Sequence, residues 1–216
     1  MTKLRLTGLL VVLALCIASA ANASDIVYNN FGNNWDYQCC VGGTLGGPNS
    51  PVGWVIQANQ FTAGVSGSVS EIDVAIGWVT GTNGATVSLW TDNGGIPGVQ
   101  LGSWDIGPLP NFGTNPPDHS TITGISGINV TAGQTYFLMA STPNDTWDAW
   151  NWNSTGAVGL VDFSTDGGAT WNQAFGSTLY AFEVLANQAT PEPGTFALLG
   201  TGLLALGAGL RRKFSS

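Results

Sequence analysis

Aromatic and amide side chains alternate between positions 147 and 153, and this pattern suits either sugar binding or core packing. If the segment is a strand, Trp150 and Trp152 share one face while Asn151 and Asn153 share the other. Aromatic rings stack on the C–H faces of sugars, and Asn side chains form hydrogen bonds with hydroxyl groups. Large aromatic rings also commonly fill cores. The run from Trp147 to Trp152 therefore predicts either a glycan-binding surface or a part of the core.

Residues 164–171 read Ser-Thr-Asp-Gly-Gly-Ala-Thr-Trp, which resembles the Asp-box of sialidases and related β proteins. Ser164, Asp166 and Gly168 suit a tight hairpin turn in which the carboxylate accepts backbone N–H groups, with Trp171 packed beneath. In sialidases the motif occurs away from the active site, and those enzymes repeat it and use an arginine cluster. Since the middle of this chain has one good copy and no Arg, we expect a structural turn and exclude a sialidase.

Cys39 and Cys40 are the only cysteines beyond the first 23 residues. An exported domain with two thiols normally pairs them. Adjacent cysteines can close only a strained eight-membered ring, whose Cα atoms are closer than the usual ~4.4–6.8 Å. The alternatives are a vicinal disulfide near Trp35 and Tyr37, an intermolecular bond, or two free thiols.

The sequence has no complete pattern for catalysis or for metal binding. His119 lies beside Asp118 in a Pro-rich loop, and the chain has no Gly-x-Ser-x-Gly nucleophile elbow. Ca²⁺ prefers about six to eight oxygen ligands. Acidic residues at 92, 145–148 and 162–166 offer such oxygens, but without the spacing of an EF-hand. We expect no catalytic residue and no cofactor, and we keep Ca²⁺ as the one candidate ion.

The first 23 residues have the features of a secretory signal peptide. Lys3 and Arg5 precede an apolar run over 9–17, and Ala21 and Ala23 form a small-x-small cleavage pattern. We therefore expect a signal helix, export through the Sec machinery, and cleavage after Ala23.

The other end of the chain, 190–216, combines a short motif, an apolar segment over 194–210 and a basic end. The motif and the basic end consist of Pro191, Glu192, Pro193, Arg211, Arg212 and Lys213. At ~1.5 Å per residue, a helix over the uncharged stretch 196–210 reaches roughly 22 Å, short of the ~30 Å hydrocarbon core. The basic end would hold the C-terminus in the cytoplasm. We expect a transmembrane helix that pauses in the inner membrane.

These three parts, in this order at the end of the chain, resemble the PEP-CTERM sorting tail of Gram-negative bacteria. The resemblance implies recognition by exosortase, a membrane transpeptidase, and cleavage near 191–193. The chain would then be the substrate and would contribute no catalytic group. It would begin as an inner-membrane precursor and end at the cell surface, in the outer envelope or in the extracellular matrix.

Charge is distributed unevenly along the chain. All five Lys and Arg residues lie in the terminal segments, and of the 13 acidic residues only Glu192 does, so the middle carries 12 acids and no Lys or Arg. Nucleic-acid binding needs cations that displace counterions from phosphate. Nucleotide sites also usually use Lys or Arg. The composition therefore excludes nucleic-acid partners and leaves an exopolysaccharide as the candidate partner, with bridging Ca²⁺ if it is a polyanion.

Short alternating runs separated by Gly, Asn, Pro and Asp predict one all-β domain over 24–189. Within 71–78, Ile72, Val74, Ile76 and Trp78 share one face, and we expect this strand to form a hairpin with 86–91. Nine or ten such strands predict a jelly-roll-like β-sandwich, flanked by the signal helix and the transmembrane helix.

Three stretches of the middle, 78–82, 87–92 together with 95–98, and 149–156, resemble the choice-of-anchor R type of module that is often found ahead of such sorting tails. The resemblance implies a β-sandwich and export, and it brings no assigned activity. We therefore expect a non-catalytic β-sandwich of the envelope or extracellular matrix. The alternatives are a carbohydrate-binding module that uses the region 147–152, and a glycoside-active enzyme.

Overall fold

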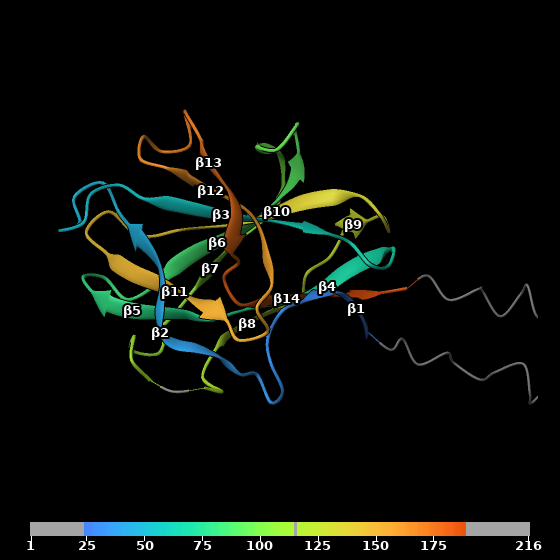
Figure 1. The fold of residues 1–216 in the computed structure, drawn as a ribbon, viewed down its shortest axis with the longest axis horizontal. Coiled ribbons are helices and arrows are strands. Elements are labelled where there is room, and N and C mark those ends of the chain that lie inside the picture. Colours follow the sequence, from blue (N-terminus) through green and yellow to red (C-terminus); the bar gives the residue numbers. More distant parts are fainter. Residues whose placement is uncertain (1–23, 115, 189–216) are drawn as a thin grey trace, which may run out of the picture. The chain divides into compact units, whose positions relative to one another are not determined.

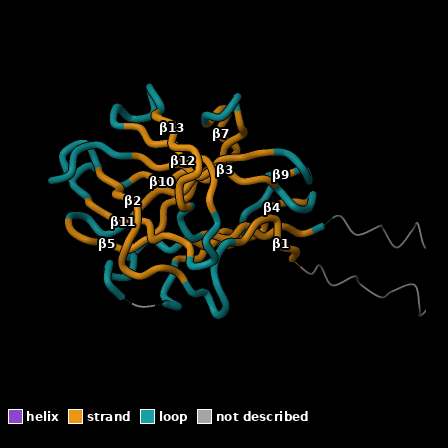
Figure 2. The backbone as a smooth tube through the Cα atoms, viewed as in Figure 1, coloured by secondary structure: helices purple, strands orange, loops and turns teal. Residues whose placement is uncertain are grey.

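The computed structural model describes residues 24–114 and 116–188, which lie within one compact unit, Ser24–Gln188 (Figure 1). Figure 2 shows strands joined by loops throughout this part of the chain. It holds 14 strands and no helix, so the all-β prediction is confirmed here, with more strands than the nine or ten expected. No helix that could cross a membrane occurs among these residues. The predicted signal and transmembrane helices lie outside them.

A five-stranded antiparallel sheet contains both ends of the described chain. Its strands, in spatial order, are β1 (Ser24–Asn29), β14 (Phe182–Asn187), β4 (Gly67–Val74) and β8 (Ser120–Thr123), and β9 (Asn129–Val130) pairs with β4. In the second half of β4 the residues alternate, since Ile72 and Val74 face the core while Glu71 and Asp73 lie on the other face. Acidic side chains are thereby gathered on the outer face of this sheet.

The second sheet has six antiparallel strands. In spatial order these are β13 (Asn172–Thr178), β12 (Val158–Ser164), β3 (Ile56–Thr62), β10 (Thr135–Ser141), β6 (Ala85–Asp92) and β7 (Pro97–Ile106). The β6–β7 hairpin turns at 93–96, where the Asp92 carboxylate accepts the Gly95 N–H at 2.7 Å. A small third sheet has the order β2 (Tyr37–Gly46), β11 (Trp147–Asn153) and β5 (Ile76–Thr80).

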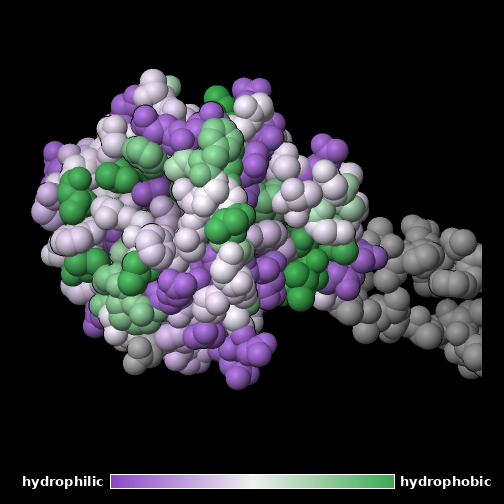
Figure 3. All heavy atoms as spheres, in the orientation of Figure 1, coloured by the Kyte–Doolittle hydropathy of each residue, from purple (hydrophilic) through white to green (hydrophobic). Residues whose placement is uncertain are grey.

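One apolar core joins the three sheets. Leu89 and Leu138 enter it from the six-stranded sheet, Val74 and Phe182 from the five-stranded sheet, and Trp150 from the small sheet, and all five are fully buried. Burial of apolar surface against a neighbouring layer is the main favourable term in such a fold. Figure 3 shows hydrophobic residues in small separate groups among polar ones on the visible face.

The predicted hairpin between 71–78 and 86–91 is wrong. The segment breaks at Ala75, whose N–H donates to the Ala181 carbonyl and whose carbonyl accepts from Asn151, so the chain leaves the five-stranded sheet and enters the small sheet as β5. Strand β6 instead pairs with β10 and β7. The predicted inward face is nevertheless present, because Ile72 and Ile76 are fully buried.

Candidate functional site

The aromatic run predicted from 147–153 is strand β11, and its central ring lies in the core. Trp150 is fully buried, stacks on Tyr180 with ring centroids 5.3 Å apart, and donates its indole N–H to the Ala181 carbonyl at 3.0 Å. Trp147 and Trp152 are half-buried. A sugar cannot reach the face of a ring that the core already covers, so Trp150 is excluded from any ligand platform.

The two asparagine side chains of this strand donate hydrogen bonds to backbone carbonyl groups. Asn151 donates its side-chain N–H to the Ala75 carbonyl at 2.9 Å, and Asn153 donates to the Leu179 carbonyl at 2.6 Å. Both side chains are buried. The burial of Trp150, Asn151 and Asn153 favours core packing over glycan binding for these three residues. Each asparagine side chain shares its carbonyl acceptor with its own backbone N–H group.

Cys39 and Cys40 form a vicinal disulfide in β2, with an S–S distance of 1.96 Å. They occupy an irregular part of the β2–β11 pairing, where Asn151 is opposite Gly42 but the next residue, Trp152, is opposite Gln38. Cys39 packs against a small cluster that includes Phe31, and Cys40 is exposed.

The Asp-box segment forms the turn between β12 and β13. Asp166 accepts the backbone N–H of Thr170 at 2.9 Å and its hydroxyl at 2.6 Å, and Ser164 donates its hydroxyl to the same carboxylate at 2.8 Å. The Ser164 hydroxyl oxygen also accepts the Gly168 N–H. These bonds lower the pKa of Asp166 to about 2, those from Thr170 contributing most. Trp171 packs onto a separate apolar cluster around Phe137, on the outer face of the six-stranded sheet.

That outer face also holds a pocket of about 250 Å³, which sequence reasoning missed. The pocket lies between the β6–β7 turn and the Asp-box turn, and Trp90 and Trp171 supply its two aromatic rings. The residues that line it are Ile56, Trp90, Pro97, Gly98, Met139, Gly167, Gly168 and Trp171. These residues come from separate parts of the chain, so no local spacing could reveal their proximity.

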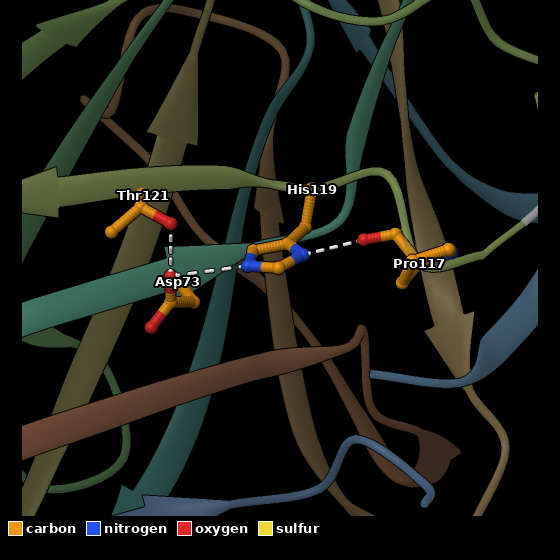
Figure 4. A network of polar contacts seen from close by, with 4 residues as sticks. All are labelled: Asp73, Pro117, His119 and Thr121. Carbon is orange, nitrogen blue, oxygen red and sulfur yellow. Dashed lines mark hydrogen bonds and ion pairs between the residues drawn. The ribbon is translucent and has the colours of Figure 1, made fainter. Parts of the chain in front are cut away.

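A second cluster that the sequence did not indicate surrounds His119 (Figure 4). The imidazole Nε2 lies 3.4 Å from the Asp73 carboxylate, and Nδ1 lies 2.6 Å from the Pro117 carbonyl oxygen. Thr121 donates its hydroxyl to the same oxygen of Asp73. Trp35 stacks on the imidazole with ring centroids 4.4 Å apart. The sequence placed His119 in an exposed loop, but its side chain is only 17% exposed.

The neighbours of His119 determine its chemistry. Both ring nitrogens face acceptors, and this arrangement favours the doubly protonated ring, which has no lone pair to accept a proton. The hydrogen bond to Asp73 raises the pKa of His119 above its usual value, and the carbonyl of Pro117 acts in the same direction. His119 is the only side chain of residues 24–188 that can carry a positive charge near neutral pH. Its geometry suits a structural cation rather than a general base.

Carboxyl groups surround this cation on the outer face of the five-stranded sheet. Glu183 is directly opposite Asp73 across β14 and β4, and both are buried. Burial, followed by repulsion from Asp73 and Glu71, raises the pKa of Glu183 to about 7. Among the described residues no group of three or more His, Cys, Asp or Glu side chains is arranged to hold a metal ion. The three acidic segments considered for Ca²⁺, at 92, 145–148 and 162–166, place Asp92, Asp148 and Asp162 on separate strands, β6, β11 and β12.

A comparison with known protein families finds a match in the C-terminal tail. A family model described as the PEP-CTERM protein-sorting motif matches residues 189–213, which lie outside the described residues. No curated protein matches the chain significantly. The match contains both the Pro-Glu-Pro motif and the basic end, so the predicted sorting tail is confirmed as a motif. It indicates an exported protein that exosortase recognises.

Proposed function

We propose that this chain is an exported protein of the cell envelope or extracellular matrix, processed by exosortase, whose β domain acts without catalysing a reaction. The observation that carries the proposal is the sorting motif over 189–213. In this proposal the signal peptide directs the chain through the Sec machinery. The apolar segment 194–210 then holds the precursor in the inner membrane until exosortase acts near 191–193.

The β domain is best understood as a jelly-roll-like sandwich of the choice-of-anchor R type. Its two large sheets contribute to one core, which supports a sandwich. A non-catalytic role is supported by His119, since both of its nitrogens face acceptors, and by the burial of Asp73 and Glu183. Two carboxylates that hydrolyse a glycoside must reach the same sugar ring from an open cleft. Asp73 and Glu183 are buried, and buried carboxylates cannot do so without rearrangement.

The sorting role is tested by replacing Pro191, Glu192 and Pro193 with alanine in cells that express exosortase. The full-length precursor is expected to accumulate in the inner-membrane fraction, because the transpeptidase no longer recognises the tail. Immunoblots of fractionated cells and the intact mass of the protein measure this. The matched control carries Thr190→Ala and Thr195→Ala, which flank the motif, and it should be processed normally. Normal release or surface display of the triple variant would overturn the proposal.

A further inference from the structure

The pocket on the outer face of the six-stranded sheet has the form of a small binding site. Ile56 of β3 and Met139 of β10 come from the centre of the sheet. The start of β7, with Gly98, and the Asp-box turn, with Gly167, complete the lining. The β6–β7 turn and the Asp-box turn are in contact, since Gln173 next to the Asp-box donates to the Gly95 carbonyl at 2.6 Å. The Asp-box turn is thus more than a hairpin connection, because it forms one wall of a cavity.

The size of the pocket limits what can enter it. Pockets for drug-sized ligands have volumes of roughly 300–1,000 Å³. At about 250 Å³ this pocket lies below that range. It therefore suits a single ring or one terminal unit of a chain, and not a long segment of polymer.

The lining is aromatic and its rings are held in place. Trp90 donates its indole N–H to the Ser88 hydroxyl at 2.8 Å, and the bonds of Asp166 order the turn that precedes Trp171. Both rings are only half-buried, unlike Trp150. The electron-rich face of an aromatic ring attracts the partly positive C–H groups of a sugar face. Rings that are fixed before binding lose little entropy when a ligand arrives.

A buried carboxyl group lies beside the floor of the pocket. Asp162 of β12 is directly opposite Ala58 of β3, and Ala58 is opposite Met139 of β10, so the three side chains form one row on this face. Asp162 is fully buried, and neither of its carboxyl oxygens has a hydrogen-bond partner among the described residues. Buried polar atoms are normally hydrogen-bonded. Asp162 has no exposed surface and does not line the pocket, so it borders the site without contacting a ligand.

The negative charge of the domain favours neutral sugars over acidic ones as ligands of the pocket. Residues 24–188 contain 12 acidic residues and no Lys or Arg. Nothing in them can neutralise a uronate or a sulfated sugar near this pocket. Burial, followed by repulsion from Asp92, raises the pKa of the neighbouring Asp162 carboxyl. Like charges in a site of reduced polarity repel strongly. The chemistry therefore favours a ligand that has hydroxyl groups, an apolar ring face and no charge.

We propose that the pocket between Trp90 and Trp171 binds one ring of a neutral sugar, such as a terminal hexose of a neutral polysaccharide. The ring lies against the two indoles and Met139. This site differs from strand β11, where the sequence had suggested glycan binding. The proposed sugar site goes beyond the sorting role. Sugar binding and processing by exosortase are measured in separate experiments, so either proposal can fail without the other.

The test uses saturation-transfer NMR on the full chain in a detergent that has no sugar headgroup. The probes are the methyl glycosides of glucose, galactose and mannose, with methyl glucuronide as the charged comparison. At least one neutral glycoside should bind, with a dissociation constant on the order of 1 mM. Trp171→Ala should weaken that binding about tenfold, which is the effect of ~1.4 kcal/mol. The control Phe175→Ala removes a ring that is 74% exposed and outside the pocket, and it should bind like the unmodified protein.

Two further variants test the pocket if the Trp171→Ala protein does not fold. If circular dichroism shows that Trp171→Ala does not fold, Trp171→Phe and Trp90→Phe replace it, because they keep a ring and should weaken binding severalfold. The proposal is overturned if no neutral glycoside binds, if glucuronide binds as well as the neutral sugars, or if neither Trp substitution changes the affinity. Any of these results would leave the sorting experiment unaffected.

Discussion

At the scale of single residues, Asp166 shows how one carboxylate can order a turn. It accepts a backbone N–H and a hydroxyl from Thr170 and a hydroxyl from Ser164, so its charge is stabilised by donors that are all within four residues of it. Hydrogen bonds to a charged group are stronger than those between neutral groups. This local network explains why the pattern of residue types alone was enough to predict the turn.

We predict that Asp166→Ala lowers the midpoint of thermal unfolding by about 2–5 °C at pH 7. The lowered pKa, about 2, means that the stabilisation by Asp166 is present above the ordinary pKa of an Asp and is lost as the pH falls through about 2. The difference should therefore still be present at pH 5. Scanning calorimetry of both proteins measures it. The control Asp118→Ala removes an exposed carboxylate that has no hydrogen bond to another described residue, and it should shift the midpoint by less. Equal midpoints for Asp166→Ala and the unmodified protein would contradict the prediction.

At the scale of elements, the close approach of β2 to β11 depends on a glycine. A Cβ atom at Gly42 would overlap the carbonyl oxygen of Trp150 and also approach the Asn151 backbone to 2.9 Å. Backbone atoms of a paired strand cannot move aside without breaking the ladder. The lack of a side chain at Gly42 therefore allows β2 to pair closely with β11. This pairing places Trp150 in the core and Cys39–Cys40 at the edge of the small sheet.

We predict that Gly42→Ala costs more than ~2 kcal/mol of unfolding free energy, because it overpacks a site that is enclosed by backbone. The matched control is Gly133→Ala. Gly133 has open space around the position of a Cβ, and its φ of +79° makes alanine unfavourable by about 1 kcal/mol for conformational reasons alone. Urea denaturation measures both. A smaller loss for Gly42→Ala than for Gly133→Ala would show that the sheet tolerates the extra methyl group.

At the scale of the whole molecule, the described domain has many buried acids and one cation to offset them. Burial raises the pKa of Asp148 and that of Asp162 to about 7, and Glu183 reaches the same value. The folded protein therefore accommodates each of these three carboxyl groups more easily in its protonated form. The stability that these groups contribute is fully present below their ordinary pKa values near 4 and is lost as the pH rises through about 7. The raised pKa of His119 acts in the same direction, since its contribution is full below its ordinary pKa and is lost as the pH rises through the higher folded value.

We therefore predict that the protein is most stable in mild acid, near pH 4.5, and that its unfolding midpoint falls by several degrees between pH 5 and pH 8.5. At still lower pH the lowered pKa values of Asp145 and Asp166 reverse the trend. Tryptophan fluorescence during heating, recorded over this pH range, measures the effect.

Asp148→Asn is the matched variant for this pH dependence. It removes one of the titrating groups while keeping its shape, so the difference between the midpoints at pH 5 and pH 8.5 should become smaller. A midpoint that is independent of pH, or higher at pH 8.5 than at pH 5, would contradict the assignment of these carboxyls as buried and protonated on folding.

The sequence by itself determined the features that depend on neighbouring residues. The all-β class follows from short alternating runs, the inward face of Ile72 and Val74 follows from a period of two, and the sorting motif at 189–213 is continuous in the chain. The Asp-box turn belongs to the same group, since its partners are all local.

Only the tertiary structure decided the features that depend on distant segments. The break at Ala75 separates β4 from β5 because the partners of that backbone are Asn151 and Ala181, far along the chain. Likewise, Trp150 is buried and Trp171 lines a pocket, although the motifs around the two rings did not indicate either outcome alone. Whether a tryptophan fills a core or faces a ligand depends on what the rest of the chain places against it. That is decided by packing between segments and not by the spacing of residues within one.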